Sequence, residues 1–309
     1  MEALVGCTGF VGSNLLASHA FDCTYHSTDI QDAYGTRPDL LVYAGIRAEK
    51  YMANMQPELD RLHTNQAVEI IERIQPRKLV LISTIDVFPT PIDVDERSAV
   101  DRDGLQAYGR NRYDLECQIR ERYEDALIVR LPGLFGPGIK KNFIYDMIRI
   151  IPSAIKQDKM AELLERDASL EQYYTLDASG FYRCRDLNNG EIKTLKEKFF
   201  ALGFTALNFT DSRSQFQFYP LVRLWEDIQV ALDNDLRLWH AATEPVSAAD
   251  IYYDVTGETY ANELGRKPAL YRYRTIYDAI FGGADGYICS RQEIMADIKK
   301  FVEKELSTI

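Results

Sequence analysis

The stretch GCTGFVG, residues 6–12, decides the fold that we predict for this chain. It follows a short apolar run, Ala3 to Val5, and it precedes a helical pattern over residues 13–20. A buried strand, a glycine-rich turn and a helix N-terminus together form an anion site, because glycines let the backbone approach a diphosphate and the free N–H groups of the helix face it. Three glycines spaced GxxGxxG also occur in ordinary turns, so the interpretation depends on the rest of the chain.

Strands and helices alternate after this stretch. Continuous apolar runs predict strands at 40–45, 79–84 and 126–131, each buried on both faces as in a parallel sheet. Helical periodicity follows Pro57 and returns over 106–123. The alternation predicts an α/β fold with a Rossmann-type, doubly wound parallel sheet. Its site is expected where the strands end, since loops at that edge build active sites.

The character of the sequence changes after residue 138, which suggests two regions. We expect a dinucleotide-binding domain at 1–138 that the chain rejoins at about 216–245. A smaller, partly α-helical substrate-binding region is expected at 139–215 and 246–309. A hairpin is predicted around Asp177-Ala178-Ser179-Gly180 in the charged and aromatic part of that region.

Composition excludes several classes of protein. The formal net charge of −11 over 309 residues argues against a nucleic-acid or anionic-membrane partner, which would need clustered Lys and Arg. Neither a membrane-length apolar run nor HxxxH or CxxC spacing is present, so we expect no membrane helix and no metal site. The first strand leaves no room for the basic start of a signal peptide, and the five cysteines are scattered. We therefore expect a cytoplasmic protein with reduced thiols.

An acid follows the predicted second strand at 21–27. Asp29 lies 17 residues beyond Gly12, where a dinucleotide fold places a carboxylate that binds the adenosine ribose hydroxyls and repels a 2′-phosphate. No Arg or Lys follows until Arg37. This favours NAD over NADP, although a solvated loop aspartate would give the same pattern.

With these positions in place, the chain resembles the extended short-chain dehydrogenase/reductases, the NAD-dependent epimerase/dehydratase family. The matching features are the glycine loop, a Thr at the end of a strand, a partial YxxxK helix 24 residues later, a structural Asn and an RxxxxFGPG turn: Gly6, Gly9 and Gly12, Thr84, Tyr108 to Arg112, Asn65, and Arg130 to Gly138. Residues 38–150 are most similar to the dTDP-4-dehydrorhamnose reductases, through PDLLVYAG, ISTIDVF and GIKKNFIYDMI. Residues 153–215 match nothing that we can name.

The resemblance implies a set of site residues. The catalytic group would consist of Thr84, which binds the reacting oxygen, Tyr108 as acid/base, Arg112 and Asn65. The cofactor would be held by Gly6, Thr8, Gly9, Phe10, Val11, Gly12, Asp29, Ala44, Gly45, Ser83, Tyr108, Arg112, Pro132 and Leu134. Candidates for substrate binding are Asp86, Asn142 and Arg213.

Arg112 departs from the family, which has Lys at this position. A phenol with a pKa near 10 is a poor base at neutral pH, so a cation beside Tyr108 is needed to stabilise the phenolate. In the family the Lys also binds the nicotinamide ribose. Arginine supplies the charge, but it is longer and planar and does not release a proton.

Two functions remain open from the sequence. The first is an oxidoreductase that uses NAD to reduce or epimerise a nucleotide-activated sugar or a related hydroxy or keto substrate. The second is a dinucleotide-binding sensor or scaffold that has lost turnover together with the Lys. The family also implies a homodimer built from the helices at 59–74 and 106–123, with Leu62, Ile70, Leu115 and Ile119 as its apolar positions.

Overall fold

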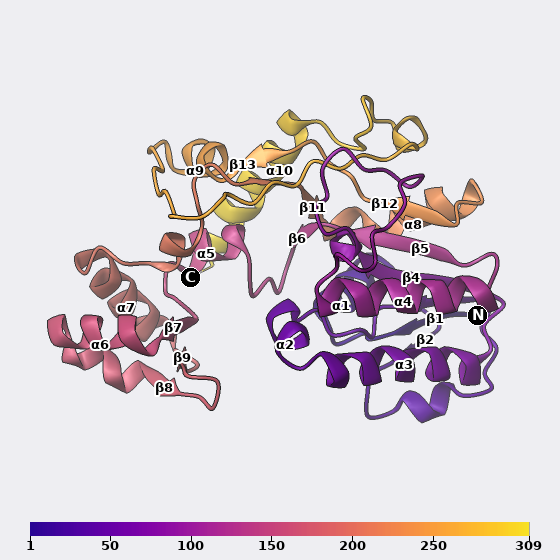
Figure 1. The fold of residues 1–309 in the computed structure, drawn as a ribbon, viewed down its shortest axis with the longest axis horizontal. Coiled ribbons are helices and arrows are strands. Elements are labelled where there is room, and N and C mark those ends of the chain that lie inside the picture. Colours follow the sequence, from indigo (N-terminus) through magenta and orange to yellow (C-terminus); the bar gives the residue numbers. More distant parts are fainter. Residues whose placement is uncertain (309) are drawn as a thin grey trace. The chain divides into compact units, whose positions relative to one another are not determined.

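A computed structural model describes residues 1–308. Six parallel strands form one sheet in the order β12-β5-β4-β3-β1-β2 (Figure 1). The strands are β1 (Glu2–Val5), β2 (Cys23–Tyr25), β3 (Leu40–Tyr43), β4 (Lys78–Thr84), β5 (Leu127–Leu131) and β12 (Leu238–His240). The predicted α/β fold is confirmed. From β1 the strand order runs to β2 on one side and to β3 on the other, and ligands of such sheets bind at this reversal.

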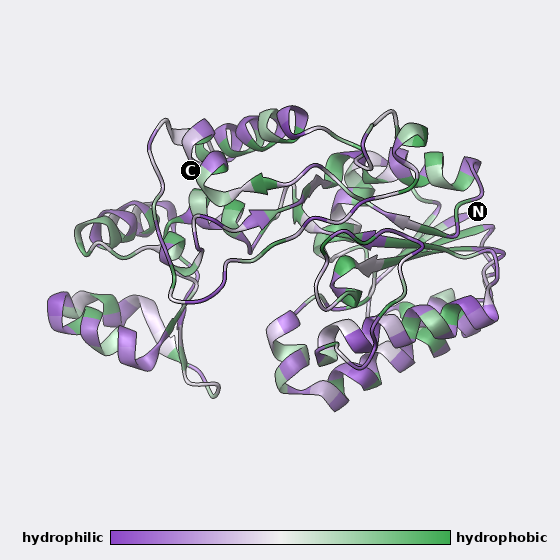
Figure 2. Ribbon diagram, turned by 45° about the horizontal axis from the view of Figure 1, so that its top comes forward, coloured by the Kyte–Doolittle hydropathy of each residue, from purple (hydrophilic) through white to green (hydrophobic). Residues whose placement is uncertain are grey.

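Helices cover both faces of the sheet. They are α1 (Phe10–Ser18) and α8 (Leu224–Asp233) on one face, and α3 (Pro57–Ile74) and α4 (Ala107–Arg122) on the other. α3 and α4 lie side by side along the sheet (Figure 1), and both carry hydrophobic and hydrophilic residues in turn (Figure 2). The sequence did not predict the short helix α2 (Lys50–Met55) between β3 and α3.

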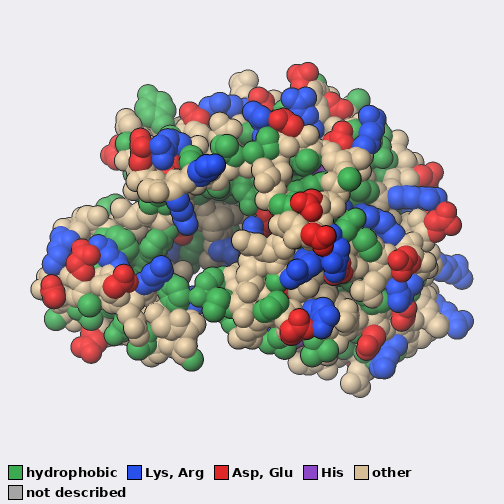
Figure 3. Space-filling model, in the orientation of Figure 1, with side chains coloured by type: hydrophobic (Ala, Val, Ile, Leu, Met, Phe, Trp, Pro, Cys, Tyr) green, Lys and Arg blue, Asp and Glu red, His purple; other side chains and the backbone are tan. Residues whose placement is uncertain are grey.

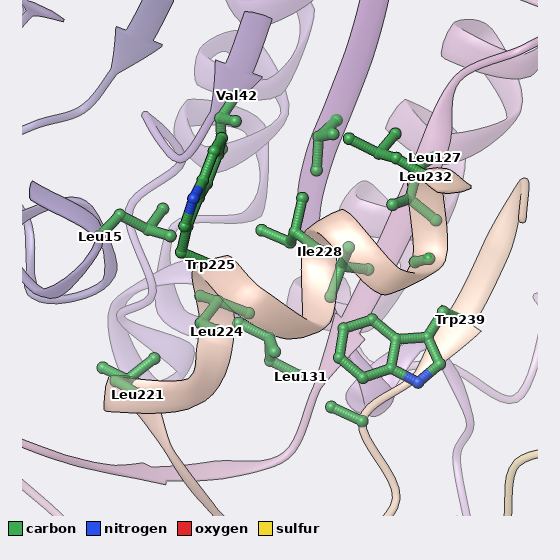
Figure 4. Packing of buried hydrophobic residues seen from close by; sticks show 14 of the residues in the cluster. Leu15, Val42, Leu127, Leu131, Leu221, Leu224, Trp225, Ile228, Leu232 and Trp239 are labelled. Carbon is green, nitrogen blue, oxygen red and sulfur yellow. The ribbon is translucent and has the colours of Figure 1, made fainter. Parts of the chain in front are cut away.

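Each strand sends alternate side chains to opposite faces, which explains why its residues are apolar throughout. In β3, Val42 packs toward α1 and α8, whereas Leu41 packs toward α3 and α4. Figure 4 shows Trp225 and Ile228 of α8 in the first of these layers, beside Val42. Each fully buried aliphatic side chain of this kind contributes about 1.5–3 kcal/mol to stability.

The second layer limits the dimer interface that the resemblance implied. Leu115 and Ile119 are 2 % and 0 % exposed and belong to the core against the sheet, so they offer nothing to a partner. Ile70 also packs against this core, while Leu62 is exposed. The homodimer itself stays a prediction, but two of its four proposed apolar positions were wrong.

The chain divides into two compact units. The first consists of Met1–Ile139, Gln215–Val246 and Leu270–Asp297. The prediction assigned all of 246–309 to the second region, whereas the segment from Leu270 returns to the first unit. Tyr273 of this segment is fully buried in the first unit. The Gln217 side chain holds its backbone there, donating to the Tyr273 carbonyl at 2.9 Å and accepting from the Tyr273 N–H at 2.9 Å.

The second unit consists of Lys140–Ser214, Ser247–Ala269 and the residues from Ile298. Its segment without family resemblance has its own core, in which Leu163, Leu195 and Phe199 are fully buried. The predicted hairpin forms there as two strands of a three-stranded antiparallel sheet, and two helices pack on it. These elements are β7 (Ala154–Lys156), α6 (Gln157–Arg166), β8 (Tyr174–Leu176), β9 (Phe181–Cys184) and α7 (Asn189–Ala201).

The remaining elements are short or lie near the unit boundaries. They are β6 (Gly133–Phe135), α5 (Phe143–Arg149), β10 (Gln215–Phe216), β11 (Phe218–Pro220), β13 (Val246–Ser247), α9 (Ala248–Thr256) and α10 (Arg291–Leu306). Within residues 1–308, no helix is both long enough and apolar enough to cross a bilayer. On the face shown in Figure 3, Lys and Arg side chains lie among Asp and Glu side chains.

Candidate active site

The glycine loop follows β1 and leads into α1. Gly6 has φ +89°, and a Cβ there would lie 2.5 Å from the Ala44 carbonyl oxygen. A Cβ on Gly12 would lie 2.1 Å from the Gly6 carbonyl oxygen. The turn is closed by the Gly9 N–H, which donates to the Gly6 carbonyl at 3.0 Å. Side chains are therefore excluded at both ends of this turn, as in a backbone cradle for a diphosphate.

The start of α1 fits an anion. Gly9 is the residue before its first turn, and no acidic side chain lies in that turn to neutralise the positive end of the helix. Of the other loop residues, Thr8 is exposed, while Phe10 and Val11 are half-buried and pack against the core. This unit of the structure therefore fits the diphosphate of a dinucleotide on geometric grounds.

Further predicted cofactor residues lie at the carboxyl ends of neighbouring strands. Ala44 and Gly45 follow β3, and the Ala44 N–H donates to the Val5 carbonyl at 2.9 Å. Pro132 directly follows β5, and Leu134 lies in β6 (Gly133–Phe135), just before the FGPG turn. Asn14 of α1 was not predicted, but its amide donates to the Pro137 carbonyl at 3.0 Å and so ties that turn to the glycine loop.

Asp29 lies just beyond β2, beside the same edge of the sheet. Its carboxylate accepts from the His26 backbone N–H at 2.7 Å and lies 3.1 Å from His26 Nε2. A carboxylate has further acceptor positions, so ribose hydroxyls could still bind. Arg37 is tied elsewhere, since its Nε donates to the Gln75 side chain at 2.9 Å.

Thr84 and Tyr108 come together at the end of β4. The Thr84 side chain lies close enough to the Tyr108 hydroxyl to lower its pKa. Thr84 also accepts from the Asp86 N–H at 3.2 Å. Gly109, which the sequence analysis did not single out, makes this approach possible, because a Cβ there would lie 2.1 Å from the Asp86 carbonyl oxygen. The predicted pair is thus adjacent, on two elements that cross closely.

Arg112 lies one turn along α4 from Tyr108, as the spacing predicts. Its Cζ is 4.1 Å from the centre of the Tyr108 ring, so the guanidinium lies over the ring face. Nη1 donates to Asp60 of α3, and Nη2 donates to the Arg47 carbonyl at 2.5 Å. The side chain is 4 % exposed. Arg112 therefore has the position expected from the YxxxK pattern, but two of its three nitrogens are engaged by protein groups.

The Tyr108 hydroxyl is held in its protonated form. Burial raises its pKa above the usual value of 10, and the nearby carboxylate of Asp86 acts in the same direction. The charge of Arg112 and the nearby Thr84 side chain act against this shift but do not outweigh it. At neutral pH the group is accordingly a proton donor.

A polar cluster lies beside this pair. Asp86 Oδ1 lies 3.0 Å from the ammonium of Lys50 and accepts from the Tyr271 hydroxyl at 3.1 Å. Burial and the Asp86 charge raise the pKa of Tyr271, so its hydroxyl also stays protonated. Lys50 was not predicted, because it belongs to an unpredicted helix. Tyr271 lies in a Tyr-rich segment, 271–277, whose sequence suggested either stacking on a ligand or packing, and its hydrogen bond to Asp86 was not predicted.

Ser83 belongs to a buried ionic network rather than facing outward. It donates to Glu116 at 2.6 Å, and Glu116 also binds Arg130 through Nη2 at 2.6 Å. Both charged side chains are at most 2 % exposed. Glu116 continues the series of Tyr108 and Arg112 at four-residue spacing on α4, which is a signal that the sequence contained.

Three predicted residues are not brought to Tyr108 by any described contact. Asn65 is exposed on α3, and its amide oxygen accepts from Gln118 at 3.5 Å, about 15 Å along α4 from Tyr108. Asn142 caps α5 in the second unit, accepting from the Ile144 N–H at 3.0 Å. Arg213 binds Asp211 at 2.8 Å through Nη2 and Glu263 at 2.8 Å through Nη1, so its charge is already compensated.

Comparison with known proteins identifies the fold. No model of a known protein family matches the chain, and no curated protein does. A solved dTDP-4-dehydrorhamnose reductase from Yersinia enterocolitica is 14 % identical, with a TM-score of 0.62 and 99 % of each chain covered. One from Bacillus anthracis in complex with NADP is also 14 % identical, with a TM-score of 0.62 and coverage of 98 % of this chain and 97 % of that chain.

A solved NAD-dependent NDP-hexosamine 5,6-dehydratase involved in tunicamycin biosynthesis is 13 % identical, with a TM-score of 0.63. The match covers 100 % of this chain and 98 % of the dehydratase chain. All three are enzymes of the family that the motifs resemble. The chain has their fold. At these identities the likeness concerns the fold, and the fold implied by the resemblance is confirmed.

Proposed function

We propose that the chain is an NAD-dependent oxidoreductase of the extended short-chain dehydrogenase/reductase type, acting on a carbonyl or hydroxyl group of a nucleotide-activated sugar. The proximity of the Thr84 and Tyr108 side chains, in the same unit as the glycine cradle, is the observation that supports this most strongly. The solved reductases and dehydratase with this fold support the substrate class.

The cofactor would lie with its diphosphate on Gly6, Gly9 and Gly12 and its adenosine ribose at Asp29. The carboxylate at position 29 supports NAD, although one reductase with this fold was solved with NADP. When bound, the nicotinamide supplies a hydride to a carbonyl carbon, or accepts one from an alcohol carbon.

The side chains of this unit would then handle the proton. In reduction, Thr84 donates a hydrogen bond to the substrate oxygen and Tyr108 Oη transfers its proton to that oxygen as the C=O π bond is lost. Solvent returns a proton to the phenolate. The carbonyl compound is reduced by two electrons and the dinucleotide is oxidised by two. Oxidation of an alcohol reverses these steps and requires the phenolate first.

The test measures binding and turnover separately. Binding of NADH and NADPH is followed by fluorescence titration, and NADH oxidation is followed with 4-keto nucleotide sugars. Tyr108→Phe should retain NADH binding and lose turnover. Tyr113→Phe, also on α4, serves as the matched control. Absence of dinucleotide binding in the unaltered protein would refute the proposal.

A second function has one specific observation in its favour. Arg112 is engaged by Asp60 and the Arg47 carbonyl, so the Lys of the family has no free counterpart at that position. A dinucleotide-binding sensor without turnover would show tight NADH binding and no oxidation with any 4-keto or 4-hydroxy nucleotide sugar.

A further inference from the structure

Asp60 is the residue around which the Arg112 side chain is arranged. It accepts from Arg112 Nη1 and from the Asn111 amide at 2.8 Å, and it is 8 % exposed. Asn111 also donates to the Pro57 carbonyl at 3.1 Å, at the start of α3. The carboxylate is therefore fixed between α3 and α4, and it fixes Arg112 in turn.

The other nitrogen of Arg112 reaches the chain between β3 and α2. Nη2 donates to the Arg47 carbonyl, and Asn54 at the end of this segment accepts from the Tyr108 backbone N–H at 2.9 Å. The same segment follows Ala44 and Gly45, the predicted cofactor residues. Arg112 and Tyr108 thus bind the two ends of the segment from Arg47 to Asn54, which follows the predicted cofactor residues.

An ordinary helix–helix ion pair would not require the guanidinium to lie over an aromatic ring. The Arg112 guanidinium lies over the Tyr108 ring, while two of its three nitrogens bind Asp60 and the Arg47 carbonyl. Arg112 therefore packs against one face of the Tyr108 ring, and the Asp60 carboxylate compensates the Arg112 charge. It differs from the free ammonium that the family resemblance implied.

We propose that Asp60 is a positioning residue of this site. By binding Arg112 it makes that side chain a fixed support of the Tyr108 ring instead of a cofactor ligand, and it adapts Tyr108 to donate a proton in carbonyl reduction. This inference rests on the proposed function for its reaction, but not for the state of Tyr108. Carbonyl reduction at this site should therefore proceed from the neutral phenol and stop at the pH where Tyr108 loses its proton.

The groups facing the Tyr108 hydroxyl give the sign of the effect. Asp86 and Asp60 favour the neutral phenol, while Arg112 and Thr84 favour the phenolate. Replacing Asp60 by Asn keeps an acceptor for Arg112 and removes the negative charge. The Tyr108 pKa should then fall, with about tenfold more phenolate at neutral pH for each unit of change.

The first measurement does not need turnover. Protein labelled at tyrosine Cζ is titrated by NMR without cofactor, and the Tyr108 signal is assigned by its loss in Tyr108→Phe. Asp60→Asn should lower the pH at which this signal titrates. Glu58→Gln, which removes the partner of Arg61 in an exposed pair on the same helix, should leave it unchanged. An unchanged titration in Asp60→Asn refutes the inference.

The second measurement follows the pH dependence of carbonyl reduction. Reduction needs the protonated Tyr108, so in Asp60→Asn the pH above which kcat/KM for reduction falls should shift downward, in step with the NMR titration. A purely structural role for Asp60 would reduce stability and leave this pH profile and the NMR titration where they were, which also refutes the inference.

A third variant covers the case in which Asp60→Asn does not fold. Arg112→Lys restores the family residue, yet Asp60 would still hold the new ammonium, so NADH affinity should stay within about twofold. A gain of tenfold or more, as expected for a released charge-assisted hydrogen bond, would show that position 112 binds the cofactor directly. If the unaltered protein binds no dinucleotide, the proposed function fails, while the NMR titration still decides the role of Asp60.

Discussion

His240 offers a quantitative test of the buried network beside β4 and β5. Its ring is 0 % exposed, Nε2 accepts from Arg130 Nη1 at 3.2 Å, and Nδ1 therefore carries the proton that is donated to the Arg274 carbonyl at 3.2 Å. A second ring proton would point at a guanidinium that can only donate. Burial and the Arg130 charge accordingly lower the His240 pKa to about 3.

The magnitude follows from proton linkage. An unfolded histidine binds a proton below about pH 6.5, whereas His240 in the folded protein stays neutral down to about pH 3. Acid therefore favours the unfolded state through this residue. Each pH unit in that interval costs about 1.4 kcal/mol, so lowering the pH from 7.5 to 5 should remove about 2 kcal/mol of the free energy of unfolding.

The assay compares this pH effect in two proteins by urea unfolding. His240→Gln can keep both hydrogen bonds and cannot titrate, so it should lose about 2 kcal/mol less than the unaltered protein between pH 7.5 and 5. The comparison is needed because Glu96 and Asp146, whose pKa values burial raises, act in the opposite direction. His63→Gln on α3 is the matched control. Equal losses in His240→Gln and the unaltered protein would refute the reasoning.

Three further predictions concern single side chains. Gly12→Ala would place a Cβ 2.1 Å from the Gly6 carbonyl oxygen, so NADH affinity should fall at least about tenfold in a fluorescence titration. Gly265→Ala is the control, because a Cβ there meets open space, and it should leave the NADH affinity unchanged. Asp29→Ser should lower the ratio of NADH to NADPH affinity by about tenfold, because it removes the carboxylate that would bind the ribose hydroxyls. The same titration measures this ratio, with Asp32→Ser as the control. An unchanged ratio in Asp29→Ser would exclude a contact between Asp29 and the ribose. Asp146→Asn should raise the free energy of unfolding at pH 7 by about 4 kcal/mol and have little effect below pH 4. Burial raises the Asp146 pKa from 3.8 to about 7, so between these values only the unfolded state ionises, at about 1.4 kcal/mol per pH unit. Urea unfolding at pH 7 and pH 4 tests this, and equal effects at both would contradict it.

The core of the fold could be predicted because its signals are local. The all-apolar stretch of β3 and the periodicity of α3 each depend on a few neighbouring residues, and the structure confirms the parallel sheet that they indicate. The return of the chain from Leu270 to the first unit depends on contacts across more than 50 residues, such as that between Gln217 and Tyr273. No pattern within the segment itself indicates them, so the sequence placed it in the wrong region.

The candidate site shows the same division between local spacing and distant partners. The interval between Thr84 and Tyr108 could be counted, and in the structure the Thr84 side chain lies close enough to Tyr108 to affect its pKa. Lys50 and Tyr271 could not be predicted, since they meet at Asp86 only through the tertiary fold. Glu116 could also have been predicted from local spacing, because it lies four residues after Arg112 on the same helix, but it was missed.

Arg112 combines both cases. Its spacing from Tyr108 correctly placed it against the ring, but its chemical state depends on Asp60, which is 52 residues away. An arginine at this position cannot be assigned the role of a lysine from the pattern alone, because its five donors can be taken up by other groups. Here a carboxylate and a backbone carbonyl engage two of its nitrogens. The substitution and Asp60 have to be interpreted as one unit, in which the acid determines whether the cation faces the cofactor or supports the tyrosine.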